Sequence, residues 1–255
     1  MALNTFPSGK HLSITKFISR LLFVFFGMAL SFSAPGNADE ENLQDAFKNG
    51  KFILDTRVRY ENVKAANFIN NAEGLTFRAR FGFETAPYKG FVLLAEGDFT
   101  RDLGVNDFNS TVNGKTQFPV IADPDSARLN RFSITYSGLD KFTFGVGRQR
   151  LVLDNARFVG NVGFRQNEQT FDSALFQTNL IDEVTFTYVY VWQVNRIFGS
   201  QSPVGKLDTK THLFNVSYGG LPVGKITGYA YFMNVDGAAA ASNQTVGIRL
   251  TGEQE

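Results

Sequence analysis

The sequence predicts an all-β protein in which antiparallel strands follow one another in an up-and-down order. Two observations carry this prediction. Apolar and polar residues alternate with a period of two in ten successive segments, and the connections between these segments alternate between short and long. A third observation narrows the class. Cysteine is absent, so the alternation, and not a disulfide framework, must specify the fold.

Residues 1–38 have the pattern of a secretory signal peptide. A basic start precedes the apolar run Leu21–Phe32, which is followed by small residues at Gly36 and Ala38. The apolar run is short for a membrane-spanning anchor, so we predict an N-terminal signal helix that is cleaved and a chain that is exported. Residues 39–255 then form one domain, because they contain neither a repeat of fixed sequence nor a low-complexity linker.

The alternation is clearest in the second segment, Leu75–Glu84. Leucine, alanine and phenylalanine occupy one parity, whereas Thr76, Arg78, Arg80 and Glu84 occupy the other. Residues of one parity share a face of the strand, so each segment has an apolar and a polar face. The ten predicted strands are Phe52–Glu61, Leu75–Glu84, Phe91–Arg101, Arg128–Tyr136, Lys141–Leu153, Phe171–Leu180, Glu183–Asn195, Thr211–Gly219, Lys225–Val235 and Gln244–Thr251.

The connections differ in length according to the end of the meander at which they fall. The short ones are Ala86–Gly90, Ser137–Asp140, Ile181–Asp182 and Gly219–Gly224, and the long ones are Asn62–Gly74, Asp102–Ala127, Asp154–Thr170, Arg196–Lys210 and Asp236–Asn243. All short turns therefore lie at one end and all long loops at the other. This asymmetry is typical of outer-membrane barrels.

Alternation alone leaves open which face meets water. A soluble β-sandwich buries its apolar face, whereas a membrane barrel shows that face to lipid and wets the charged face in a lumen. The leader, the strand lengths and the aromatic residues near strand ends favour the barrel. We therefore predict a transmembrane up-and-down antiparallel β-barrel in the outer membrane of a Gram-negative cell. Its expected partners are outer-membrane lipid and the barrel-assembly machinery.

The segment after the last predicted strand is TGEQE. Outer-membrane barrels commonly close on a strand that ends in an aromatic residue, and this segment has none. We therefore predict that the ten strands belong to a larger barrel and that residues 39–255 are incomplete at the C-terminus.

Arginines recur on the polar face of the predicted strands. An arginine stays charged and offers a planar fork to carboxylates, so a ring of arginines attracts anions. Cross-strand ion pairs are the alternative role, and for most of these arginines the more common one. The predicted lumenal residues are Arg57, Arg59, Arg78, Arg80, Arg131 and Arg249, with the acidic partners Asp55, Glu61, Glu84, Glu96 and Asp98.

The stretch Gly145–Asp172, GVGRQRLVLDNARFVGNVGFRQNEQTFD, is the candidate functional site. Its donors are suited to carboxylates: Arg148, Arg150, Arg165, Gln166 and Asn167, with Asp172 as an acidic partner. Asp154–Thr170 either folds inward as a constriction or stays on the surface. We predict the inward arrangement and an anion-binding role for the three arginines.

The parity of the fifth predicted strand changes within this stretch. Arg148 and Arg150 fall on the register of its apolar residues. A bulge near Gly145 or Gly147 would turn both arginines to the polar face and leave the following leucines outside, because bulges occur at glycines and re-aim side chains.

The same stretch resembles the alginate-export family of outer-membrane barrels. The matching elements are Gly147-Arg148-Gln149, Arg157-Phe158-Val159-Gly160 and Phe164-Arg165-Gln166-Asn167, followed by Gln169-Thr170-Phe171-Asp172. The resemblance covers about residues 50–195. It implies a large monomeric barrel that passes an anionic polysaccharide such as alginate, or a smaller anionic solute, through an arginine-lined constriction.

Other functions have less support in the sequence. A secreted or periplasmic sugar-binding β-sandwich and an outer-membrane hydrolase remain alternatives, but no phosphate-loop or dinucleotide signature is present. No cofactor or metal is expected. Asp107, Asp123 and Asp125 lie in a long loop and are expected to be solvated acids rather than calcium ligands. The chain after the leader has more acidic than basic residues, which argues against nucleic-acid binding.

Overall fold

The computed structural model describes residues 42–252, and the predicted leader lies outside this range. The chain divides into two units, residues 1–44 and 45–255. In the first unit, the Asn42 side-chain oxygen accepts a hydrogen bond from the Gln44 amide. This bond caps the start of the short helix α2, Leu43–Lys48. Within residues 42–252, no helix has the length and apolar character needed to cross a bilayer.

The second unit contains ten strands, and each of them overlaps one of the ten predicted segments. The strands are β1 Lys51–Val63, β2 Ala72–Glu84, β3 Phe91–Asp107, β4 Ser126–Tyr136, β5 Phe142–Gln149, β6 Thr170–Thr178, β7 Val184–Asn195, β8 Lys206–Leu221, β9 Gly224–Met233 and β10 Asn243–Thr251, with a 3-10 turn, η1 Ala239–Ala241, before β10. The predicted alternation of short turns and long connections is confirmed. Three boundaries differ by four residues or more: β3 extends to Asp107 and not to Arg101, β8 begins at Lys206 and not at Thr211, and β5 ends at Gln149 and not at Leu153.

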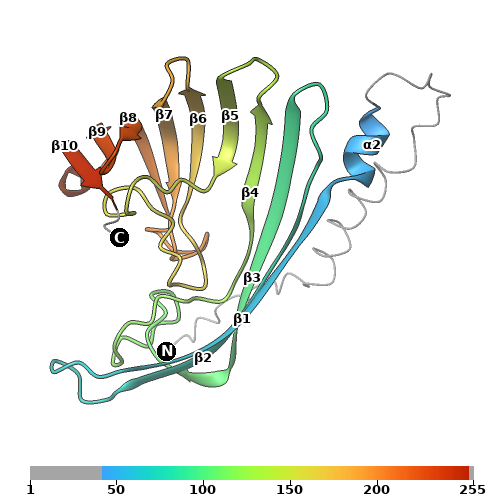
Figure 1. The fold of residues 1–255 in the computed structure, drawn as a ribbon. Helices are drawn as coiled ribbons and strands as arrows, with labels where there is room; N and C mark the ends of the chain where they lie inside the picture. The colour runs from blue at the N-terminus through green and yellow to red at the C-terminus, as the bar shows by residue number, and fades with distance from the viewer. Residues whose placement is uncertain (1–41, 253–255) are drawn as a thin grey trace. The chain divides into compact units, whose positions relative to one another are not determined.

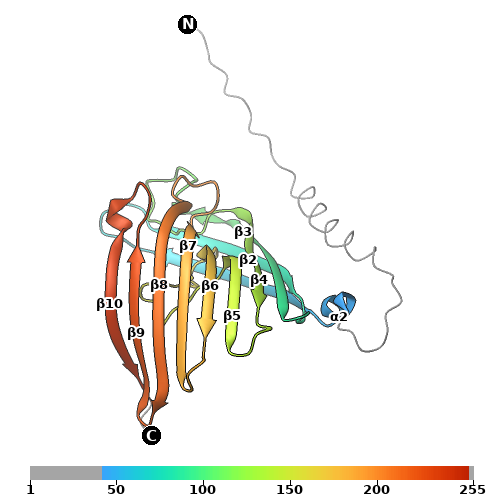
Figure 2. The same ribbon diagram turned by 90° about the horizontal axis from the view of Figure 1, so that it is seen from above.

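All ten strands belong to one sheet, in sequence order, and each is antiparallel to its neighbours in the chain. Figures 1 and 2 show a strongly curved sheet. A sandwich of two packed sheets is therefore not the fold of the described residues. Among these residues, β1 pairs only with β2 and β10 only with β9, so the sheet has two edges.

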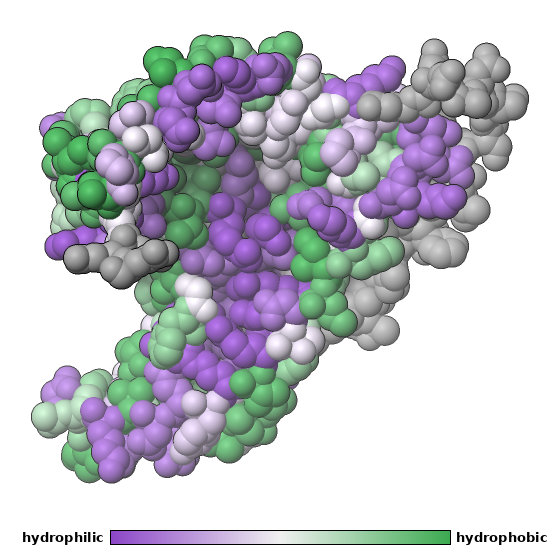
Figure 3. All heavy atoms as spheres, viewed as in Figure 1, coloured by the Kyte–Doolittle hydropathy of each residue, from purple (hydrophilic) through white to green (hydrophobic). Residues whose placement is uncertain are grey.

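The two faces of the sheet have opposite chemistry. On one face, Arg78 and Arg80 of β2 and Asp98 of β3 are at most 5% exposed. On the other, Leu54 of β1 and Ile248 of β10 are 78% and 76% exposed. Figure 3 shows hydrophilic residues gathered in the hollow of the sheet and hydrophobic residues around it. We call the charged side the concave face and the apolar side the outer face. In a water-soluble sandwich the apolar face of each sheet is buried and the polar face is exposed, so the distribution of apolar and charged residues in this sheet is reversed.

The predicted bulge near Gly145 or Gly147 is wrong. In the described register, β5 pairs with β4 and β6 without a shift. Five other strand pairs have a register shift. The shift that bears on the charged face lies between β3 and β4, where Glu96 faces Arg131 and Gly97 faces Leu129. Asn130 is therefore the extra residue of a bulge, and it lies on the concave face together with Arg131.

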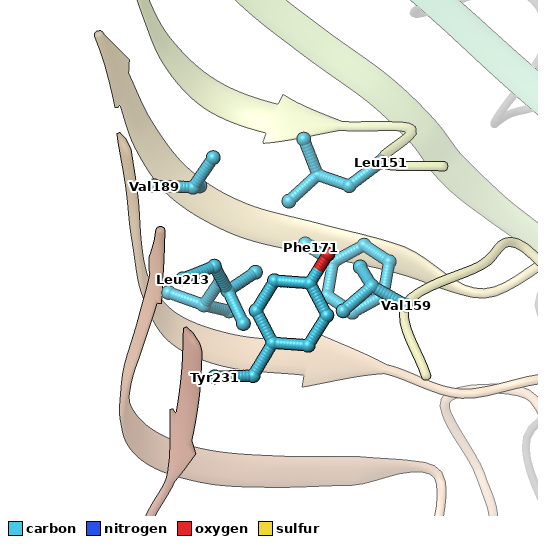
Figure 4. Packing of buried hydrophobic residues seen from close by; sticks show 7 residues of the cluster. Leu151, Val159, Phe171, Val189, Leu213 and Tyr231 are labelled. Atoms are coloured by element: carbon cyan, nitrogen blue, oxygen red, sulfur yellow. The ribbon is translucent and has the colours of Figure 1, made fainter. Parts of the chain in front are cut away.

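An apolar cluster occupies part of the concave face. Leu151 and Val159, from the connection after β5, pack against Val189, Leu213 and Tyr231 of the sheet (Figure 4). Leu151 is 5% exposed and Leu153 packs against the cluster. The prediction that the leucines after Arg150 lie outside is therefore wrong, because the chain leaves the sheet at Gln149 and turns inward.

Gly147 is required by the backbone of β5. Its φ is +120°, and an added Cβ would lie 2.3 Å from the carbonyl oxygen of Phe132 on β4. We expect Gly147→Ala to lower the free energy of unfolding by more than about 1 kcal/mol, because alanine is strained at this φ and the contact is with backbone. Denaturant titration of the folded chain in detergent measures this change.

Gly228→Ala on β9 is the matched control, because an added Cβ there meets no atom within 4 Å. We expect this control to stay within about 1 kcal/mol of the unchanged chain. Equal destabilisation by the two substitutions would contradict the explanation for Gly147.

Candidate functional site

The connection between β5 and β6, residues 150–169, lies on the concave face of the sheet. We call it the inward loop. Gln166, Asn167 and Glu168 are fully buried, although no helix or strand contains them. Their burial excludes the surface arrangement of this connection. The loop rests on the apolar cluster of β6–β9 on one side and on charged residues of β1–β4 on the other.

Arg57 of β1 binds the inward loop through its whole guanidinium group. Nε donates to the Gln166 side-chain oxygen at 2.8 Å, and Nη1 donates to the Gly163 carbonyl at 3.0 Å. Nη2 donates to the carbonyls of Phe164 and Arg165. Arg59, two residues along the same face, also donates to the Phe164 carbonyl. These arginines hold the main chain of the loop and position it.

Glu168 is the most heavily bonded carboxylate of the loop. Arg150 donates two hydrogen bonds to it, both at 2.7 Å. Asn130 of the β4 bulge and Asn161 of the loop donate at 2.6 and 2.9 Å. An Arg80 nitrogen lies 3.6 Å away. Burial raises the pKa of the Glu168 carboxyl, but these donors and charges together outweigh burial and lower the pKa to about 2.

Gln166 and Asn167 bind polar groups of the wall. The Gln166 side-chain amide donates to the carbonyl and hydroxyl of Thr76 at 3.1 and 2.8 Å. The Asn167 side-chain oxygen accepts from Ser126 at 2.7 Å and from Thr100 at 3.3 Å. Both residues are therefore structural partners of the wall, and their side-chain amides are occupied.

Asp123, from the connection between β3 and β4, also holds the inward loop. Its side-chain oxygen accepts a hydrogen bond from the backbone N–H of Gln166 at 2.8 Å. The Asp123 side chain is 1% exposed. Its second oxygen lies 3.8 Å from Arg59 and 3.7 Å from Arg165. The expectation of a solvated acid is wrong for Asp123. Among residues 42–252, no cluster of three or more acids or histidines offers a metal site.

Charged pairs of the wall complete the arrangement. Arg131 binds both oxygens of Glu96 at 2.9 and 2.6 Å, and Arg128 binds Asp98 at 3.2 Å. Arg78 pairs with Asp55. Arg128 also donates to the Glu168 carbonyl at 2.6 Å, so it joins the wall to the loop.

These contacts form a loop–wall network with an excess of positive charge. It contains eight arginines and six carboxylates among the described residues, an excess of two positive charges. Its members are Arg57, Arg59, Arg78, Arg80, Arg128, Arg131, Arg150 and Arg165, with Asp55, Glu61, Glu96, Asp98, Asp123 and Glu168.

Three members of this network were not predicted from the sequence: Arg128, Asp123 and Glu168. Asn130, which binds Glu168, was not predicted either. The positions of Arg128 and Asn130 follow from the β4 bulge. Leu129 and Phe132 are both apolar and three residues apart, which signals an inserted residue, because strict alternation separates residues of one face by two.

Arg148 is separated from the other predicted arginines. Because β5 has no bulge, Arg148 keeps the parity of Phe144 and Val146, which are 40% and 49% exposed on the outer face. It binds Asp172 through two hydrogen bonds of 2.7 and 2.9 Å. The predicted re-aiming of Arg148 towards the concave face is therefore wrong, and Asp172 lies with it.

The remaining predicted residues lie away from the loop contacts. Arg249 has the concave-face parity of β10, opposite Ile248. Glu84 ends β2 and faces Lys51 in the pairing with β1. The network therefore draws on one part of the predicted polar face and not on all of it.

Comparison with known proteins finds similarity at the level of structure. No protein-family profile matches the chain, and no curated protein matches it. OccAB3 from Acinetobacter baumannii is 14% identical with a TM-score of 0.57, over 82% of this chain and 54% of that chain. OccAB1 from the same organism is 15% identical with a TM-score of 0.55, over 78% and 48%. A BenF-like porin from Pseudomonas fluorescens Pf-5 is 14% identical with a TM-score of 0.53, over 73% and 50%.

These similarities show the fold, which is that of outer-membrane β-barrel porins. The chain spans about half the length of the solved structures it matches. The three structures are Occ-type and BenF-like porins, not alginate-export proteins. The resemblance to the alginate-export family therefore stays a hypothesis.

The pKa of Glu168 predicts that acid releases the inward loop. This pKa is about 2 in the folded chain and ordinarily 4.5, so the undocked loop binds the proton more tightly. Docking is fully stabilised above about pH 4.5 and loses this contribution as the pH falls towards 2, by about 3 kcal/mol in total. Hydrogen–deuterium exchange of residues 150–169 across this range measures the loss.

Glu168→Gln tests the assignment to this carboxyl. The variant should show faster exchange of the inward loop at neutral pH and little further increase between pH 4.5 and 2. Asp182→Asn is the control, because Asp182 is 97% exposed and lies in a turn between β6 and β7. A loop whose exchange keeps its full pH dependence in Glu168→Gln would contradict the prediction.

Proposed function

We propose that this chain, which has the porin fold, belongs to an outer-membrane pore for anionic solutes. In this proposal the sheet forms the wall of the pore and the inward loop forms its constriction. The proposal rests above all on the inward loop, because it places backbone and side chains inside the curvature of the sheet where a solute would pass. Lipid-facing apolar residues and a charged interior are the arrangement that such a fold requires. The Gram-negative outer membrane is the corresponding location.

The charge of the loop–wall network supports a preference for anions. Its eight arginines exceed its six carboxylates by two. Arg131, Arg150 and Arg165 have side chains that are 18%, 33% and 18% exposed, so they can meet a passing solute. Several weak contacts allow a solute both to enter and to leave.

An acidic polysaccharide such as alginate is one candidate for the solute. It carries a carboxylate on each sugar, and arginine recognises carboxylates with two parallel hydrogen bonds. The resemblance of residues 50–195 to the alginate-export family supports this candidate. A small anionic solute fits the same charge pattern. Outer-membrane lipid and the barrel-assembly machinery are the proposed partners of the wall, and no nucleic acid is proposed.

The proposed selectivity predicts that replacing Arg150 changes the ion selectivity of the pore and that replacing its neighbour Arg148 does not. Arg150 binds Glu168 on the concave face, and Arg148 lies on the outer face. Arg150→Ala removes one lumenal charge and should lower the anion-to-cation permeability ratio about two- to threefold. Arg148→Ala should leave the ratio unchanged. The reversal potential in a planar bilayer under a potassium chloride gradient measures the ratio.

Two results would contradict the proposed pore. The unchanged chain could show a cation preference or no conductance. Alternatively, Arg148→Ala could alter selectivity while Arg150→Ala does not, which would place the passing ions on the wrong side of the sheet.

The membrane location predicts that the outer face is intolerant of charge. Ile134 of β4 is 43% exposed on that face, and its neighbour Thr135 has the opposite parity. Ile134→Arg should make folding into lipid vesicles less favourable by up to about 2–4 kcal/mol, depending on depth. Thr135→Arg should have a smaller effect, and the reverse order would contradict lipid contact by the outer face.

A further inference from the structure

Phe164 is an exposed apolar residue of the inward loop. It is 65% exposed, although its neighbours Gln166, Asn167 and Glu168 are fully buried. Its carbonyl accepts hydrogen bonds from Arg57 and Arg59. The backbone beneath the ring is therefore fixed, so the exposure of the ring belongs to an ordered part of the loop.

An arginine covers one face of the Phe164 ring. The guanidinium carbon of Arg59 lies 3.6 Å from the ring centroid, and that of Arg165 lies 5.2 Å from it. Both arginines also bind Glu61, at 2.5 and 3.1 Å, which fixes them in place. The ring thus has a rigid cationic backing from β1 and from the loop itself.

This backing changes what the exposed part of the ring can bind. The face of a phenyl ring is normally negative and repels anions. A guanidinium group behind the ring offsets that potential and is itself attracted to it. The exposed part of the ring can therefore accept the flat apolar side of a solute that carries negative charge, while Arg165 lies close enough to meet a carboxylate.

We propose that Phe164, backed by Arg59 and flanked by Arg165, is a stacking site for a ring that bears a carboxylate, of which a uronate sugar is the case that fits the proposed pore. This inference rests on the proposed function and names a binding residue within it. The apolar face of the sugar ring stacks on Phe164, and its carboxylate lies against the arginine.

Among residues 42–252, two other phenylalanine rings lie under an arginine guanidinium group, but they differ from Phe164. Phe158 lies under Arg157 at 5.6 Å, yet its ring packs on Tyr229 and Tyr231 at 5.8 and 6.3 Å. Phe198 lies under Arg196 at 4.5 Å in the connection between β7 and β8, outside the inward loop. Phe198 is therefore a matched control for an arginine-backed ring at another place.

The first test is block of the chloride current of the full chain in a planar bilayer by a trimeric uronate oligosaccharide. Phe164→Ala and Phe164→Leu should each weaken the block about two- to tenfold, because both remove the flat face. Phe198→Ala should not weaken it. Block by citrate, an acyclic tricarboxylate, should be equal in all four proteins. An unchanged uronate block in both Phe164 variants, or equal weakening of citrate block, would overturn the proposal.

The second test measures binding of the uronate trimer by tryptophan fluorescence, independently of conductance. Phe164→Trp in a Trp192→Phe background places the chain's one tryptophan at the site. Its emission should shift on addition of the uronate trimer and stay unchanged on addition of citrate. An absent shift overturns the stacking site even in a conducting pore. A shift in a chain without anion-selective conductance would instead overturn the proposed function and leave the site in place.

Discussion

The structure depends on neutralising buried carboxylates with arginines that come from different parts of the chain. Glu168 is fully buried, and a buried charge is stable only where it is paired and hydrogen-bonded. Removing one member of such a pair leaves an uncompensated charge that typically costs about 3–5 kcal/mol. The inward loop therefore has few alternative positions, because a displacement would separate the buried carboxylate of Glu168 from its positive partners. Asp123 and Glu96 apply the same constraint from the wall.

This constraint explains why the concave face is divided in two. On β1–β4 the loop meets guanidinium groups and carboxylates, and on β6–β9 it meets the apolar cluster around Tyr231. The polar contacts fix direction and register, since hydrogen bonds require defined geometry. The apolar contacts contribute area removed from water without requiring particular partners. The contacts with β1–β4 therefore orient the loop, and the contacts with β6–β9 pack it against the sheet.

The strands and turns were predictable from sequence because their signal is local. A period of two is read within a single segment, and all ten segments form strands. Local rules did not locate the bulge. Glycine at 145 and 147 permits an irregular backbone but does not require one, and the extra residue is Asn130 of β4. The contact between Arg57 and Gln166 joins residues 109 positions apart, so composition predicted the donors of the site but not their partners.

One consequence follows from the way in which Arg57 grips the loop. Three of its four acceptors are main-chain carbonyls, those of Gly163, Phe164 and Arg165, which every amino acid possesses. The anchorage is thus largely indifferent to the side chains at these three positions. Substitutions at 163 and 164 can therefore change what the proposed pore recognises while Arg57 still anchors the loop, whereas Arg165 is also tied to Glu61 and Asp123 through its side chain.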